Sequence, residues 1–428
     1  MMNKRYAFAL LLVLAAAGCG NSNNPPATSA PASPAPPAPP PSSTPPTPAL
    51  YTETNATTGN EVLAYSRASD GSLKSIGSYS TGGVGTGLPT DSNALPFPVG
   101  GATGAVKLNP AGTFLYAVDA GSNDVAAYSV ATDGTLTFID NYPTNGTSPG
   151  SITIDATGTY LYVLNTGTLA AGTNPGAPAG NTGGITGFTI GSSGALTAIA
   201  GSAQPLSTGN TGAYVDPSEV AFSPDGSYLV VTEKLSGTPT PGTIDIYPVT
   251  TGVAGPPVST SSTGAIPFGF GFTPSGTLVV SNVVAVANTN LGSATSYTAT
   301  AQGALTVVSG GVGDNQSAPC WIALNPAGTI AYATNTISGS ISAYSVSDTG
   351  ALTLVPPASG ASAAATTGAG PIDDIVTPDN AYLYVIQSNA GGSPGTILGY
   401  SIGSTGGLTP VTTGVTGLPE GSLGLAVR

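Results

Sequence analysis

The fold is decided by a short pattern whose first copy reads Val62-Leu63-Ala64-Tyr65 followed by Asp70-Gly71-Ser72-Leu73. An alternating run around an aromatic residue is typical of a β-strand, and Asp-Gly before a second apolar run is typical of a hairpin turn, because glycine readily adopts positive φ. Six further copies follow, centred on Tyr128, Phe188, Tyr247, Tyr297, Tyr344 and Tyr400. The pattern therefore predicts seven antiparallel hairpins.

A second turn precedes most of these hairpins and has the form Asn-Pro-Ala-Gly or Ser-Pro-Asp-Gly. Its proline column comprises Pro110, Pro224, Pro274, Pro326 and Pro378, with Ala156 in the remaining copy. Seven residues earlier stands another column, with Pro149, Pro217, Pro267, Pro319 and Pro371, and with Thr103 in the second repeat. Each period of roughly fifty residues thus contains four strands, which is the content of one propeller blade.

The two ends of the repeat array complement each other. The N-terminal copy, from Ala49 to Tyr79, has only three strands and lacks the one that should come first, whereas residues 418–427 have the Pro-x-x-apolar form of an opening strand and then stop. Joining them would close the ring and remove the free sheet edges of an open array. We therefore predict an all-β fold, with residues 49–428 forming one seven-bladed β-propeller of four-stranded blades, closed by the C-terminal strand.

The composition excludes several functional classes. Seven basic side chains against twenty acidic ones give a net charge of −13, which repels nucleic acids and anionic lipid surfaces. The chain has no histidine, so it lacks the usual general base near neutral pH, the commonest zinc ligand and every Ser-His or Cys-His nucleophile pair. We expect no cofactor, no metal site and no nucleic-acid partner.

The first eighteen residues are interpreted as a signal peptide, because Lys4 and Arg5 precede an apolar run that is too short to span a bilayer. The run ends in Leu14-Ala15-Ala16-Ala17-Gly18-Cys19, which resembles the bacterial lipobox, whose cysteine is lipidated. The alternative is an ordinary secretory signal with Cys19 merely near the cleavage site. Gly20, rather than aspartate, favours the outer membrane, with the protein facing the periplasm or the cell surface.

Residues 19–48 are expected to form a tether between lipid and domain. The tract is rich in Pro, Ala, Ser and Thr, which cannot build a packed core and favour extended polyproline II. The membrane would be reached through the N-terminal lipid only. Cys320 is the second of two cysteines, so the propeller cannot hold an internal disulfide.

The repeat resembles the lactonase family of seven-bladed propellers, which includes 6-phosphogluconolactonase-like proteins and muconate-lactonising cycloisomerases. The resemblance rests on Tyr-Ser-Val at 128–130, on Asp-Gly-x-Leu at 70–73, and on Asn-Pro-Ala-Gly-Thr-x-x-Tyr at 109–116 and 325–332. It covers residues 49–428. It implies a binding site around the central channel, where the family's basic residues gather to hold an anionic sugar or carboxylate.

In the family's enzymes the opening strands commonly begin Pro-Arg-His, and this chain departs from that form. The position after the column proline holds Gly104, Gly150, Ser218, Phe268, Cys320, Ile372 and Glu420, and the next holds Ala105, Ser151, Glu219, Gly269, Trp321, Asp373 and Gly421. Neither position contains arginine or histidine. A clamp of several guanidinium groups is therefore not available.

Acidic and aromatic residues stand at the starts of the opening strands instead, and the candidate binding residues are Glu219, Trp321, Asp373, Asp374 and Glu420. Carboxylates and an indole could bind a cation, a sugar or a cationic peptide, and paired carboxylates could perform acid-base chemistry if burial raised one pKa. The alternative is that they solvate the channel mouth, with Trp321 packing on a neighbouring blade. Cys320 lacks a histidine partner and is expected to be buried.

Two functions remain open. The first is a monomeric, lipid-anchored propeller of the cell envelope that binds a small molecule, a glycan or an envelope protein without catalysis. The second is an extracytoplasmic lactone hydrolase, in which Glu219, Asp373 or Glu420 would replace the missing histidine as the base.

Overall fold

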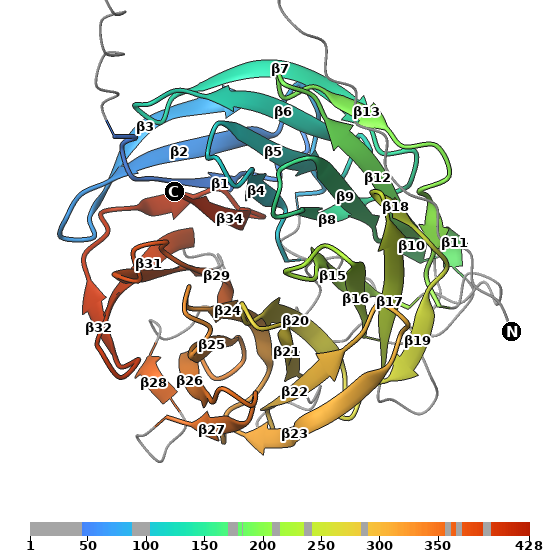
Figure 1. Ribbon diagram of the computed structural model, residues 1–428. Helices are drawn as coiled ribbons and strands as arrows, with labels where there is room; N and C mark the ends of the chain where they lie inside the picture. The colour runs from blue at the N-terminus through green and yellow to red at the C-terminus, as the bar shows by residue number, and fades with distance from the viewer. Residues whose placement is uncertain are drawn as a thin grey trace, which may run out of the picture. The chain divides into compact units, whose positions relative to one another are not determined.

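Every strand in the described part of the chain belongs to a small antiparallel sheet, as the hairpin pattern predicts. The computed structural model describes residues 45–87, 103–169, 179–181, 183–207, 215–234, 242–283, 290–355, 361–364, 370–387 and 395–428. Seven of its sheets surround a common centre as the blades of a propeller (Figure 1). The predicted all-β, seven-bladed fold is therefore confirmed.

We number the blades from the one that holds the N-terminal strands. From the centre outward, blade 1 contains β34 (Leu423–Val427), β1 (Ala49–Glu53), β2 (Glu61–Arg67) and β3 (Leu73–Ser80); blade 2 contains β4 (Val106–Leu108), β5 (Phe114–Asp119), β6 (Asp124–Val130) and β7 (Leu136–Pro143). Blade 3 contains β8 (Pro149–Ile154), β9 (Tyr160–Asn165) and β12 (Gly184–Ile190), with β13 (Leu196–Ala198) and β14 (Gln204–Pro205) outside. Blade 4 contains β15 (Pro217–Phe222), β16 (Tyr228–Glu233) and β17 (Thr243–Thr250), with β18 (Val253–Ala254) and β19 (Val258–Ser261) outside.

Blade 5 contains β20 (Pro267–Phe272), β21 (Thr277–Asn282), β22 (Ser293–Ala299) and β23 (Leu305–Gly313). Blade 6 contains β24 (Pro319–Leu324), β25 (Ile330–Asn335) and β26 (Ser340–Val346), with β27 (Leu352–Leu354) and β28 (Ala361–Ala364) outside. Blade 7 contains β29 (Pro371–Val376), β30 (Tyr382–Gln387) and β31 (Gly395–Ile402), with β32 (Leu408–Val411) and β33 (Thr416–Leu418) outside. A separate hairpin pairs β10 (Thr168–Leu169) with β11 (Ala179–Asn181).

The ring closes through the two ends of the repeat array. The C-terminal strand β34 pairs antiparallel with β1, with Leu50 opposite Val427 and Tyr51 opposite Ala426 (Figure 1). The backbone N–H of Arg428 also donates to the carbonyl of Ala49 (3.0 Å). The predicted closure is thus confirmed, although the strand is shorter than residues 418–427, because Leu418 belongs to β33 of blade 7.

The compact body begins at Pro45, four residues before the predicted boundary. The predicted signal peptide, the lipidation site at Cys19 and most of the predicted tether lie outside the described residues. All three remain predictions. Within the described ranges, no helix has the length and apolar character needed to cross a membrane.

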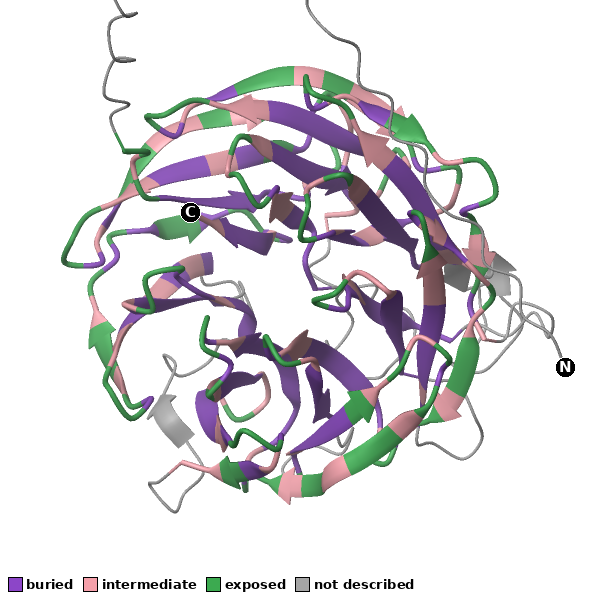
Figure 2. Cartoon of the chain, viewed as in Figure 1, coloured by how far each residue is buried: buried purple, intermediate pink, exposed green. Residues whose placement is uncertain are grey.

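The hydrophobic core lies between neighbouring blades. The inner strands are largely buried, whereas the outer strands alternate between buried and exposed residues (Figure 2). The second strand of a blade is covered on both faces, which explains its continuous apolar run: Leu115 and Ala117 of β5 pack in one cluster with Tyr51 of blade 1. Burying both faces of each middle strand gives the ring a rigid inner wall.

A repeated hydrogen bond joins adjacent blades. A buried tyrosine of a second strand donates its hydroxyl to the carbonyl of the turn glycine in the next blade, as Tyr162 does to Gly252 (2.8 Å). The other pairs are Tyr51 with Gly134, Tyr116 with Gly194, Tyr332 with Gly406 and Tyr384 with Gly71. Gly134 has φ 94°, a conformation that glycine adopts without strain. The same turn glycine that forms the hairpin therefore also accepts the hydrogen bond from the neighbouring blade.

Two ion pairs differ sharply in their surroundings. The ammonium of Lys234 lies 3.1 Å from the carboxylate of Asp216 and 4.7 Å from the ring centroid of Phe268, and both charged side chains are at most 2% exposed. The pair of Arg67 and Asp379 is closer, at 2.6 Å; its guanidinium side chain is 7% exposed and its carboxylate side chain 49%. Only the first pair has both of its charged groups shielded from solvent.

Candidate functional site

The opening strands of the blades line the centre of the ring. Five of them, β8, β15, β20, β24 and β29, begin at the prolines of the second column. Each has a register shift just after that proline, as between Pro217 and Glu219 in β15. Such a bulge re-aims side chains, and in β29 both Asp373 and its neighbour Asp374 line the central cavity.

The central cavity has a volume of about 210 Å³. Its wall brings together four of the five candidate residues, namely Glu219, Trp321, Asp373 and Asp374, from three different blades. The remaining lining residues are Thr103, Gly104, Lys107, Phe270, Ile322, Ala323, Leu324, Ile375, Val376 and Leu425. Blades 2, 4, 5, 6, 7 and 1 therefore all contribute to one site.

Glu219 links blade 4 to blade 5 as well as facing the cavity. Its Oε2 accepts a hydrogen bond from the backbone N–H of Phe270 (2.8 Å). Burial raises the pKa of its carboxyl to about 7, while the Lys107 ammonium and the hydrogen bond from Phe270 favour the ionised form and oppose the shift. The side chain therefore exchanges a proton close to neutral pH.

Asp373 and Asp374 form an acidic pair on β29. Burial raises the pKa of Asp373 to about 7, opposed by Lys107 and by backbone N–H groups of Asp374, Gly424 and Leu425 that donate to it. Burial, followed by repulsion from Asp373 and Glu219, raises the pKa of Asp374 well above its usual range. The Oδ2 atoms of both aspartates are buried and have no hydrogen-bond partner within the described residues.

Trp321 has two roles in the structure. Its ring packs against Phe268 of blade 5, with ring centroids 4.9 Å apart, so it does pack on a neighbouring blade. It is also 2% exposed and lines the cavity, where its Nε1 has no hydrogen-bond partner among the described residues. A buried indole N–H without an acceptor costs free energy unless a ligand or water satisfies it.

The fifth candidate, Glu420, lies elsewhere. It is exposed, in the turn before β34, and does not line the cavity. Tyr51 pairs with Ala426 as Tyr384 pairs with Ile375, so the residue of β34 that matches Asp373 is Gly424 rather than Gly421. Aligning Pro419 with the prolines of the other opening strands therefore misplaces β34 by three residues. The position of β34 is set by its pairing with β1 and not by the proline.

Lys107 of β4 is a residue that the sequence reasoning missed. It supplies the cationic side chain of the cavity wall, and it favours the ionised forms of Glu219 and Asp373. It stands in the interior of its strand rather than in the two positions compared with the family, so a search confined to those positions passes over it. The sequence signal that could have identified Lys107 is its place between the apolar residues Val106 and Leu108 in an opening strand.

Cys320 is fully buried, and burial raises the pKa of its thiol to about 12. The thiolate that nucleophilic chemistry requires is therefore scarce at neutral pH. In the described ranges no three Cys, Asp or Glu side chains are placed to hold a metal ion together.

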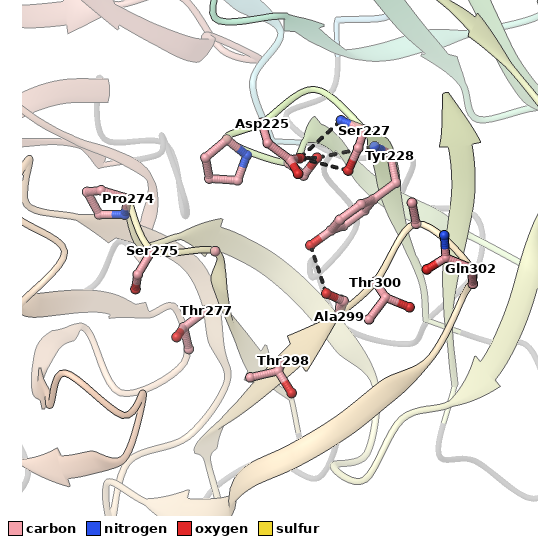
Figure 3. Close-up of a pocket in the computed structure, with 14 residues that line it drawn as sticks. Asp225, Ser227, Tyr228, Pro274, Ser275, Thr277, Thr298, Ala299, Thr300 and Gln302 are labelled. Carbon is pink, nitrogen blue, oxygen red and sulfur yellow. Dashed lines mark hydrogen bonds between the residues drawn. The ribbon is translucent and has the colours of Figure 1, made fainter. Parts of the chain in front are cut away.

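A second, larger cavity of about 800 Å³ lies between turns of blades 4 and 5 (Figure 3). Its charged side chain, Asp225, already accepts hydrogen bonds from Ser223 Oγ (2.6 Å), Ser227 N (3.0 Å) and Ser227 Oγ (2.8 Å) (Figure 3). Tyr228 donates to the carbonyl of Ala299 (3.5 Å). Because its polar groups serve the turns themselves, this cavity is a weaker candidate than the central one.

Comparisons with known proteins agree with this architecture. The family model described as Lactonase, 7-bladed beta-propeller, matches residues 58–170. A search of curated proteins found no match.

Solved structures cover far more of the chain. A candidate 6-phosphogluconolactonase from Bacteroides uniformis has a TM-score of 0.59 at 17% identity, covering 89% of this chain and 99% of its own. A protein from Lactobacillus plantarum has a TM-score of 0.60 at 20% identity, covering 90% and 99%. The periplasmic gluconolactonase PpgL from Pseudomonas aeruginosa has a TM-score of 0.51 at 18% identity, covering 68% and 79%. Sequence and fold together show that the chain resembles the lactonase family of seven-bladed β-propellers.

Proposed function

We propose that the chain is a ligand-binding propeller of the bacterial cell envelope whose central cavity holds a small polar molecule. One observation carries the proposal: four residues that line the 210 Å³ cavity each have a buried side-chain atom without a partner among the described residues, namely Thr103 Oγ1, Trp321 Nε1, Asp373 Oδ2 and Asp374 Oδ2. Buried polar groups are normally hydrogen-bonded, and a ligand bound beside these residues would supply the missing partners.

Binding without hydrolysis is favoured by what the other polar groups do. Glu219 and Asp373 accept backbone hydrogen bonds from the neighbouring opening strands, at Phe270 and at Gly424 and Leu425. These bonds hold both carboxyls in place and stabilise the ring. The chain also lacks histidine, so no imidazole can act as the base.

Lactone hydrolysis is the second candidate, and the pKa of Glu219 near 7 favours it. The Glu219 carboxylate would take a proton from a water molecule while the water oxygen attacks the lactone carbonyl, and the leaving ring oxygen would receive the proton as the C–O bond breaks. The lysine ammonium at position 107 would stabilise the negative charge on the carbonyl oxygen. Two proteins of similar fold are named a candidate 6-phosphogluconolactonase and a periplasmic gluconolactonase.

One pair of experiments separates the two candidates. Residues 45–428 would be titrated with a panel of sugars, amines and lactones by calorimetry, and lactone hydrolysis would be followed by pH-stat against the uncatalysed rate. Binding without turnover supports the first proposal, provided that Asp374→Asn weakens it and the exposed control Glu420→Gln does not. Turnover that Glu219→Gln abolishes and Glu420→Gln preserves supports the hydrolase instead.

The proposed location in the cell envelope rests on the lipobox-like sequence that ends at Cys19. Cells fed a labelled fatty acid should produce labelled, membrane-associated protein, and Cys19→Ser should release an unlabelled form. A labelled Cys19→Ser protein, or an unlabelled native one, would contradict the anchor.

A further inference from the structure

The central cavity holds more acidic than basic groups. Three carboxyls, those of Glu219, Asp373 and Asp374, line the cavity together with one ammonium, that of Lys107, and these four are the ionisable groups of its wall among the described residues. No carboxylate oxygen in the described residues lies within ion-pair distance of the lysine nitrogen at position 107. The site therefore has acidic capacity that its own cation does not neutralise.

The unpartnered atoms define what a ligand must offer. Asp373 Oδ2 and Asp374 Oδ2 require hydrogen-bond donors as long as these groups are ionised, Trp321 Nε1 requires an acceptor, and Thr103 Oγ1 can pair with either. A carboxylate pair is best matched by a positively charged donor, because charge-assisted hydrogen bonds are roughly twice as strong as neutral ones. A ligand that fits the two carboxyls and the indole thus combines a cationic donor with a separate acceptor.

The walls limit the ligand's size and character. The cavity would hold roughly seven waters at about 30 Å³ each, which corresponds to a small organic molecule of hexose size. Phe270 and Trp321 add aromatic surface to the carboxyls. Aromatic faces attract organic ammonium groups, so the apolar part of the wall favours the same class of ligand.

We infer that the central cavity binds a small organic cation that also carries a hydrogen-bond acceptor, of which an amino sugar is the simplest example. The inference rests on the proposed binding function and narrows its ligand to one chemical class. The amine sits against Asp373 and Asp374, and a hydroxyl oxygen of the ligand accepts from Trp321 Nε1.

Binding of a cation is coupled to the release of protons. With carboxyls that exchange protons near pH 7, the ligand's positive charge favours their ionised forms and lowers their pKa values. Among the described residues, the acidic groups that line the cavity are Glu219, Asp373 and Asp374, and Lys107 is the basic group. Protons should therefore be released on binding, and a neutral ligand of the same shape should release few or none.

The test uses three probes that share one skeleton: glucosamine as cation, glucose as neutral form and glucuronate as anion. Trp321 is the sole tryptophan of the chain, so its fluorescence reports occupancy of this cavity directly. Residues 45–428 would be titrated at pH 7 by fluorescence, and by calorimetry in two buffers of different ionisation enthalpy to count protons. Circular dichroism would verify that each variant is folded.

Glucosamine should bind at least tenfold tighter than glucose, with glucuronate weakest and with net proton release. Asp374→Asn and Asp373→Asn should remove the preference for the amine, whereas Glu420→Gln, which changes a carboxyl outside the cavity, should retain it. Asparagine at position 373 tolerates the native φ of 42° and can still accept from the closing strand, so this variant should fold.

Equal or tighter binding of glucose, with a change in Trp321 fluorescence, would overturn the cationic ligand and leave the binding function standing. If none of the three probes binds, the inference is overturned too. The panel of sugars, amines and lactones would then test the proposed binding function separately. Glucosamine binding that Asp373→Asn and Asp374→Asn leave unchanged would place the ligand outside this cavity.

Discussion

Replacing Tyr162 with phenylalanine removes the hydroxyl that joins blade 3 to blade 4. That hydroxyl donates to the carbonyl of Gly252 (2.8 Å) and accepts from the backbone N–H of Ala254 (2.8 Å), and the tyrosine is fully buried. The substitution leaves two buried backbone groups without a partner at little change in volume. At about 1–2 kcal/mol for each orphaned group, the expected loss is about 2–4 kcal/mol.

The assay is thermal unfolding of residues 45–428, with urea unfolding as a second measure. An unfolding entropy of about 2.1 cal/mol/K per residue amounts to about 0.8 kcal/mol/K for a body of this size, so Tm should fall by roughly 3–5 °C. Tyr160→Phe is the matched control, because Tyr160 lies on the same strand and its hydroxyl makes no hydrogen bond within the described residues. Equal Tm values for the two variants would refute the role of the inter-blade bond.

Three further changes probe the ring, the buried ion pair and the acidic cavity. Deleting residues 420–428 removes β34 and exposes the edge of β1, so the melting temperature should fall sharply, and an unchanged melting curve would contradict closure. Asp216→Asn leaves a buried ammonium unpaired and should cost about 3–5 kcal/mol in urea unfolding, whereas Asp379→Asn, at a pair whose carboxylate is half exposed, should cost less; equal losses would disprove the distinction. Burial raises the folded-state pKa values of Glu219 and Asp373 to about 7, so the folded protein binds more protons than the unfolded chain between about pH 4 and 7, and stability should fall as pH rises through that window. Melting scans from pH 4 to 8 test this: Glu219→Gln should flatten the slope, and a native profile that rises with pH would be incompatible with the buried carboxyls.

Much of the fold could be predicted because each repeat encodes its own strands and turns. The prolines at 149, 217, 267, 319 and 371 begin opening strands, as expected from residues that favour a strand's first position. The complementary ends of the array pointed to the pairing of β34 with β1, since a closed ring leaves no blade incomplete. Local patterns of this kind survive in a single sequence without knowledge of distant contacts.

The candidate site was predicted in part. Glu219, Trp321, Asp373 and Asp374 do meet in one cavity, because their strands occupy equivalent places around the ring. Glu420 does not join them, since the register of β34 depends on hydrogen bonds to β1, more than 370 residues away in sequence. No local pattern around Pro419 records that pairing.

The sequence by itself determined the number of blades, the order of their strands and the acidic, histidine-free character of the centre. The alternation of apolar residues and the glycine and proline turns act over a few residues, so they are legible one repeat at a time. Only the tertiary structure decided which polar atoms are buried without partners, that Lys107 faces the carboxyls, and that tyrosine hydroxyls join one blade to the next. These features depend on side chains from different blades meeting at the centre or across a blade interface, and burial at such meetings sets their pKa values and their demand for a ligand.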